Sequence, residues 1–142
     1  MRCAIGSDGV GPLTDALLAE LERRGVAVQR FGAVRAPAED EWASIARAVG
    51  DAVASGGADV GIVCCWTGTG VSIAANKVRG VRAALCADAT TAEGARRWND
   101  ANVLALSMRA TSAAVGLEIL DAFLRTPPSD AASDRRSIDA VE

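Results

Sequence analysis

Short apolar runs alternate along the chain with longer segments whose apolar residues recur every three or four positions. The short runs are rich in Val, Ile, Ala and Cys, and they predict strands over residues 2–6, 26–31, 60–65, 81–86 and 103–106. The longer segments predict amphipathic helices over residues 12–24, 42–56, 88–98 and 112–124, and from a glycine-containing loop through residue 76.

This alternation predicts an α/β fold with a parallel, doubly wound sheet and right-handed crossovers. Ligands of such sheets bind beyond the carboxyl ends of the strands. We therefore expect residues 7–9, residues 65–70 and the turn after Cys86 to meet in one crevice. The pattern predicts a single domain over residues 1–142, and its polar tail, residues 126–142, is expected to be irregular and to reach over a neighbouring subunit.

Composition narrows the class of protein. Half of the 142 residues are apolar and the net charge is −3, which is typical of a globular protein and argues against a nucleic-acid surface. The apolar runs are too short to span a membrane, and the first residues lack a signal-peptide pattern. The four cysteines lie in strand-like runs without CxxC spacing, so we expect reduced thiols and a cytoplasmic protein.

The chain contains no histidine. Its absence removes the commonest general acid or base and the commonest transition-metal ligand. We therefore expect neither a metal nor a cofactor, and any chemistry has to use carboxylates, thiols, lysines, hydroxyls and backbone amides.

The segment Cys65-Trp66-Thr67-Gly68-Thr69-Gly70 joins a strand to a helix. Its glycines allow a tight turn close to a ligand, and the amides at the helix start stabilise negative charge, including that of a thiolate. Such a loop can abstract a proton beside a carbonyl and hold the resulting enediolate oxygen. The alternative is a packed cysteine and a glycine turn that bind nothing.

Four more polar residues are candidates, each with a structural alternative. Asp8 follows the first strand and can bind a sugar hydroxyl or hold the turn before the helix at Pro12. Asn99 follows a helix, where Asx residues usually form turns. Arg109 and Arg136 can clamp an anion, although isolated arginines are mostly solvated.

Four segments together resemble the ribose-5-phosphate isomerase B and galactose-6-phosphate isomerase family: AIGSD at residues 4–8, residues 68–86, NDANVLAL at 99–106 and RRSID in the tail. The resemblance implies a Rossmann-like three-layer α/β/α sandwich with a five-stranded parallel sheet. It also implies aldose–ketose isomerisation of a sugar or sugar phosphate through a cis-enediolate, without metal. Members of this family usually form homodimers or dimers of dimers with shared active sites, and the resemblance implies the same for this chain.

Carried over by position, the resemblance makes Cys65 the base that moves the proton, because the glutamate used by other members falls at Val71. It assigns the oxyanion loop to Thr67, Gly68 and Gly70, with Thr69 between them. It further implies sugar-hydroxyl contacts from Asp8 and Asn99 and phosphate contacts from Arg109 and Arg136.

The chain departs from the family at five positions. Gly9 replaces a histidine, Trp98 replaces the histidine that opens the sugar ring, Trp66 replaces a glycine, Trp42 replaces a tyrosine and Ala132 replaces a tail arginine. All three tryptophans thus fall at or beside positions that line the family's pocket, where they would narrow it; lineage-specific core packing is the alternative.

Indole is not a usable proton acid near neutral pH, so a cyclic sugar should open poorly. Three explanations follow: the substrate is already open-chain, as a tetrose 4-phosphate is, another group donates the proton, or turnover has been lost. A non-phosphorylated sugar also remains possible. The second function class is a non-catalytic or partner-dependent ligand-binding subunit, which the loss of every histidine supports.

Overall fold

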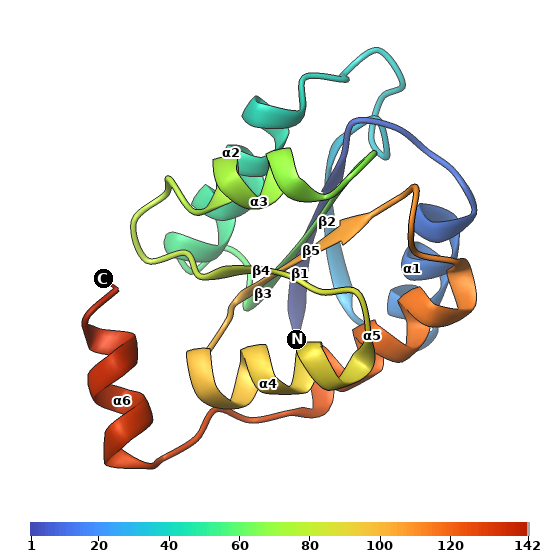
Figure 1. The fold of residues 1–142 in the computed structure, drawn as a ribbon. Helices are drawn as coiled ribbons and strands as arrows, with labels where there is room; N and C mark the ends of the chain where they lie inside the picture. Colours follow the sequence, from blue (N-terminus) through green and yellow to red (C-terminus); the bar gives the residue numbers. More distant parts are fainter. Residues whose placement is uncertain (142) are drawn as a thin grey trace.

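The computed structural model describes residues 1–141, which form one five-stranded parallel sheet between two layers of helices (Figure 1). The elements are β1 (Arg2–Ser7), α1 (Pro12–Arg23), β2 (Ala27–Gly32), α2 (Trp42–Ala54), β3 (Val60–Cys65), α3 (Thr69–Ala75), β4 (Ala83–Leu85), α4 (Ala89–Asn99), β5 (Val103–Ser107), α5 (Ala113–Arg125) and α6 (Ala132–Asp139). The predicted α/β sandwich with five parallel strands is confirmed.

The strand order is β2-β1-β3-β5-β4, so the chain reverses direction across the sheet between β1 and β3. Helix α1, which follows β1, packs on one face with α4 and α5, whereas α3, which follows β3, packs on the other face with α2 (Figure 1). The loops after β1 and β3 therefore diverge and leave a crevice between the two strand ends.

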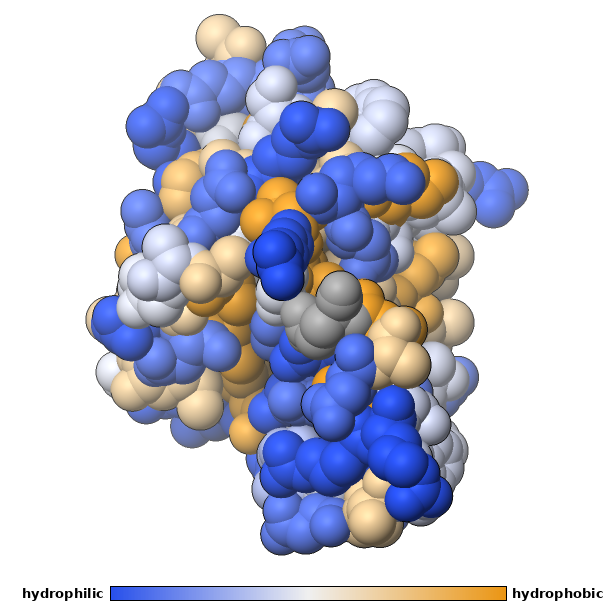
Figure 2. Space-filling view, turned by 90° about the vertical axis from the view of Figure 1, so that its left-hand side faces the viewer, coloured by the Kyte–Doolittle hydropathy of each residue, from blue (hydrophilic) through white to orange (hydrophobic). Residues whose placement is uncertain are grey.

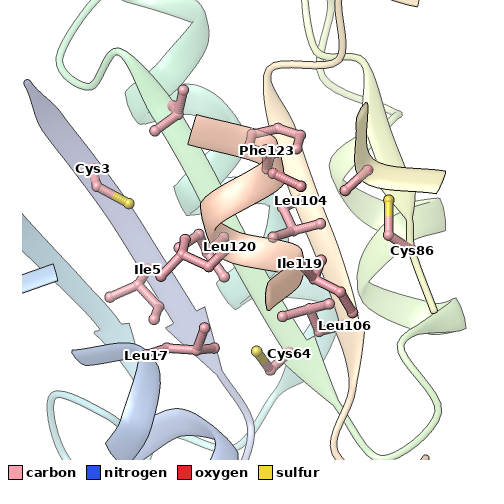
Figure 3. Close-up of a cluster of buried hydrophobic side chains, with 14 of the residues drawn as sticks. Cys3, Ile5, Leu17, Cys64, Cys86, Leu104, Leu106, Ile119, Leu120 and Phe123 are labelled. Carbon is pink, nitrogen blue, oxygen red and sulfur yellow. The ribbon is translucent and has the colours of Figure 1, made fainter. Parts of the chain in front are cut away.

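Every residue of β3 is buried, as expected for a central strand covered on both faces. Its side chains alternate between the two cores: Ile62 and Cys64 face α1 and α5, whereas Val63 and Cys65 face α2 and α3. Figure 3 shows the first of these cores, in which Cys64 lies among leucine and isoleucine side chains.

Two predictions about the chain's outer parts were wrong. Strand β4 is half as long as predicted, because the Arg82 N–H donates to the Asn102 side-chain oxygen at 2.8 Å instead of continuing the strand ladder. The tail was predicted to be irregular, but it contains α6, whose residues are all at least partly exposed. Helix α6 has Ile138 as its only large apolar residue, so it has no apolar period by which to recognise it.

No helix within residues 1–141 is long and apolar enough to cross a bilayer.

Candidate active site

Three loops meet at the carboxyl edge of the sheet, after β1, β3 and β5. The Met108 N–H donates to the Cys65 carbonyl at 2.9 Å, and the Arg109 N–H donates to the Trp66 carbonyl at 2.9 Å. The Ser107 hydroxyl also donates to the Trp66 carbonyl, at 3.0 Å. The start of the β3–α3 loop is therefore fixed to the end of β5.

Cys65 is the last residue of β3 and is 5% exposed, directly before the loop residue Trp66, which is 65% exposed. The neighbouring thiol of Cys64 lies on the opposite face of the sheet, where burial raises its pKa to about 12. Burial likewise raises the pKa of Cys86 to about 11. Buried apolar thiols of this kind are inert. Cys65 is buried as well, but of the three it is the one that lies directly before the glycine-containing loop that opens α3.

The loop after Cys65 has a backbone that its glycines make possible. Gly68 has φ of +75°, and a Cβ there would lie 2.8 Å from the Leu106 carbonyl carbon. This close approach seats the loop against the end of β5. The hydroxyls of Thr67 and Thr69 are 2.7 Å apart, and both residues are exposed. The first N–H groups of α3 have no partner within the helix, so they are available to a negatively charged oxygen.

Trp42, at the start of α2, packs against this loop. A Cβ at Gly70 would lie 3.0–3.3 Å from three atoms of the Trp42 ring system. The indole is nevertheless 45% exposed. The sequence placed Trp42 in the pocket wall, and the structure brings it onto the first turn of α3.

Asp8 follows β1 and is partly buried. Burial raises its pKa above the ordinary aspartate value, and the negative charge of Asp40 raises it further, against a lowering effect from its own backbone. The sequence left open a role for Asp8 in holding the turn before α1. The N-cap of α1 is instead Gly11, whose N–H donates to the Thr14 hydroxyl at 2.9 Å.

We predict that Asp8→Asn stabilises the fold at neutral pH. The folded protein holds the Asp8 proton more tightly than the unfolded chain, so stability falls as the pH rises through the raised pKa of Asp8, and the penalty persists above it. Urea denaturation of both proteins between about pH 4 and pH 8 should show an advantage of the variant that shrinks as the pH falls. If the stability advantage of Asp8→Asn were the same at every pH, the pKa of Asp8 would not be raised in the folded protein.

Arg109 lies beside a cavity of about 470 Å³ that also borders Gly11, Pro12, Ser112 and Ala113. These are the first residues of α1 and α5, each of which is at least 12 residues long. Within residues 1–141 Arg109 forms no ion pair, whereas most other arginines are paired. A free guanidinium between two helix N-termini is favourable for an anion such as a phosphate.

Trp98, Asn99 and Arg136 do not join this group within one chain. Helix α4 starts at the carboxyl edge and ends near the opposite edge, where Trp98 and Asn99 border a cavity of about 580 Å³ beside Ser137 and Ile138 of α6. Figure 2 faces this side of the molecule: the lower part, where α6 lies, is mostly hydrophilic, and hydrophobic surface is exposed in the hollows above it. Arg136, on α6, is exposed.

No group of three or more acidic or cysteine side chains within residues 1–141 is arranged to hold a metal ion.

The sequence reasoning missed Met108, and it included Ser7 only as part of the segment 7–9 expected at the crevice, without a role for its side chain. The Ser7 hydroxyl accepts from the Gly9 N–H at 3.3 Å and donates to the Met108 sulfur at 3.4 Å. The position of Met108, directly after a strand and before Arg109, was the only available signal.

Comparison with known proteins agrees with the fold and extends over the site loops. The family described as Ribose/Galactose Isomerase matches residues 3–141. Ribose-5-phosphate isomerase B of Escherichia coli K12 is 40% identical over 124 residues, covering 87% of this chain and 83% of that protein. The structure of ribose-5-phosphate isomerase B from Clostridium thermocellum has a TM-score of 0.92 at 36% identity, over 99% of this chain and 95% of that one. The Mycoplasma genitalium enzyme with bound ribulose-5-phosphate has a TM-score of 0.89 at 34% identity, over 99% and 93%. The chain therefore belongs to the ribose/galactose isomerase family.

Proposed function

We propose that the protein is an aldose–ketose isomerase of sugar phosphates that works through a cis-enediolate, with Cys65 as its base. The observation that carries this proposal is the position of the Cys65 thiol, at the end of β3 and at the mouth of a glycine loop that opens α3. Family membership supports the reaction class. The four free cysteines suit a reducing compartment, and we extend the proposal to a cytoplasmic location.

The residues of the loop suit the two halves of this reaction. A thiolate at Cys65 removes the proton from the carbon beside the carbonyl, and the thiol returns it to the neighbouring carbon. The negative charge that forms on the carbonyl oxygen meets the free N–H groups of residues 67–70 and the hydroxyl of Thr67. Trp42 and Trp66 offer apolar faces to the carbon–hydrogen surface of the sugar.

The two ends of the substrate would be held by groups of opposite charge. Asp8, a partly buried carboxylate at the end of β1, accepts hydrogen bonds from sugar hydroxyls. Arg109 binds the phosphate, supported by the N-termini of α1 and α5 that border the same cavity.

The remaining candidates would complete the site from a second copy of the chain. Trp98 and Asn99 border one cavity together with Ser137 and Ile138 of α6, the helix that carries the exposed Arg136. One chain thus carries the loops at the end of β3 and, separately, the residues of α4 and α6. This separation suits a homodimer, or a dimer of dimers, in which each active site takes Asn99 and Arg136 from a second copy of the chain.

We further propose that the substrate is open-chain. Opening a sugar ring requires a proton donor near the ring oxygen, and the sequence contains neither histidine nor tyrosine. A second copy of the same chain brings no histidine or tyrosine either. A tetrose 4-phosphate cannot form a five-membered ring, because its phosphate occupies the necessary hydroxyl. Ribulose 5-phosphate, the molecule bound in the Mycoplasma genitalium structure, is blocked in the same way.

Deuterium incorporation tests the reaction and the substrate class together. The protein is incubated in heavy water with tetrose 4-phosphates and ribulose 5-phosphate, and with the ring-forming ribose 5-phosphate and galactose 6-phosphate. NMR then follows deuterium at the carbon beside the carbonyl. We expect kcat/KM for the tetrose 4-phosphates to be at least about 100-fold higher than for ribose 5-phosphate and galactose 6-phosphate, the usual minimum contribution of a general acid. Ribulose 5-phosphate serves as a positive control for exchange, because the equilibrium constant fixes its kcat/KM relative to that of ribose 5-phosphate. Equal rates for both classes would contradict the open-chain preference but keep the isomerase. The unphosphorylated sugars, run in parallel, report whether phosphate is required.

The second candidate function is a non-catalytic or partner-dependent ligand-binding subunit. The complete absence of histidine favours it. No deuterium incorporation with any compound of the panel, from a folded protein that still binds one of them, would establish this second function instead.

A further inference from the structure

Met108 lies between the loop after β1 and the end of β3. Its backbone belongs to the loop after β5, and its N–H donates to the Cys65 carbonyl at 2.9 Å. The main chain of Met108 is thereby fixed to the strand end that carries the proposed base.

Its side chain reaches the loop after β1. A Cβ built at Gly9 would lie 3.7 Å from the Met108 Cε, and one built at Gly11 would also lie 3.7 Å from it. These are ordinary van der Waals distances, so the methionine fills space that the two glycines leave open. Gly9 and Gly11 have no side chains of their own with which to hold this part of the loop.

A hydrogen-bond chain joins the same two loops. Ser7 is fully buried, and its hydroxyl accepts from the Gly9 N–H at 3.3 Å and donates to the Met108 Sδ at 3.4 Å. A buried hydroxyl that loses its acceptor is destabilising, although a thioether is a weak acceptor. Removing the methionine side chain would therefore affect both the packing and this hydrogen bond.

We infer that Met108 is a positioning residue that holds the Asp8–Gly11 loop at a fixed distance from Cys65. Its effect on catalysis rests on the proposed function; its effect on the loop does not. Met108 touches neither the Cys65 thiol nor the residues of the oxyanion loop in any contact described above. It acts through the loop that carries Asp8, and a displacement of about 1 Å at such a site lowers the rate by up to about 100-fold.

Hydrogen exchange and kinetics of Met108→Ala, Met108→Leu and Leu124→Ala test this inference. Leu124 is a partly buried residue near the C-terminal end of α5, remote from the site loops, and removing its side chain is a matched loss of apolar contact. In Met108→Ala we expect the Gly9 amide to exchange about tenfold faster and kcat/KM to fall about tenfold. Met108→Leu, which restores the bulk, should return both within about threefold of the wild type.

A leucine variant that behaves like the alanine variant would assign the positioning to the sulfur, and Ser7→Ala should then reproduce it. Unchanged Gly9 exchange and unchanged kcat/KM in Met108→Ala would overturn the inference, as would equal changes in Leu124→Ala. If the wild type proves inactive on every sugar phosphate, the proposed function fails, but Gly9 exchange still decides the role of Met108.

Discussion

Cys65→Ala is expected to lower the rate of deuterium incorporation into an open-chain sugar phosphate by about 1,000-fold, the middle of the range for a general base. The reason is chemical: among residues 65–70 the Cys65 thiol is the only ionisable side chain, since the others are two hydroxyls, an indole and two glycines. The resemblance to the family aligns the glutamate that other members use with Val71, which is fully buried here. Solvent exchange followed by NMR measures the rate directly.

Cys64→Ala is the matched control. It removes the same atom one residue earlier, from the opposite face of the sheet, where burial raises the pKa of the thiol to about 12. We expect a modest loss of stability, about 1 kcal/mol, and activity within about threefold of the wild type. If both variants lose activity equally, the loss reflects a disturbed β3 and not a missing base. If Cys65→Ala retains full activity, Asp8 becomes the leading candidate for the base, because its partial burial raises its pKa and hence its basicity.

The sequence predicted the sheet well because the strand signal is local. The run from Val60 to Cys65 is apolar throughout, as a strand covered on both faces requires, and it was predicted with its observed bounds. Strand β4 was overestimated because a hydrogen bond between Arg82 and Asn102, 20 residues apart, ends it early. Such long-range side-chain bonds leave no local pattern.

The candidate site also has features that the sequence predicts and features that depend on long-range contacts. The rule that ligands bind at the carboxyl ends of parallel strands is sufficient to bring Asp8 near the loop after Cys65. It cannot find the contact between the Ser7 and Met108 side chains, because the two residues are 101 positions apart and a methionine usually fills a gap in a core. Nor can it say that Trp98 lies at the far end of α4, because that depends on the length and direction of the helix in space.

Gly68→Ala is expected to lower the free energy of unfolding by about 3 kcal/mol and the isomerisation rate by about 100-fold. Two effects add. A residue other than glycine at φ of +75° is strained by about 1 kcal/mol, and a Cβ would lie 2.6 Å from the Leu85 side chain and 2.8 Å from the Leu106 backbone. The leucine side chain can rotate away, but the backbone of β5 cannot. The loop must therefore move away from β5, and the N–H groups proposed to hold the enediolate move with it.

Gly56→Ala separates the two effects, because Gly56 has the same φ of +75° but no atom within 4 Å of an added Cβ. In Gly56→Ala the free energy of unfolding should fall only by the cost of the positive φ, about 1 kcal/mol, and the activity should be unchanged. Urea denaturation and deuterium incorporation of both variants give the comparison. A Gly68→Ala protein that is no less stable than Gly56→Ala would show that the loop can relax away from β5 without strain. A Gly68→Ala protein that is destabilised yet fully active would mean that the position of the loop does not limit the reaction. The proposed role of residues 67–70 in holding the enediolate oxygen would then be wrong, whereas the proposed role of Cys65 would stand.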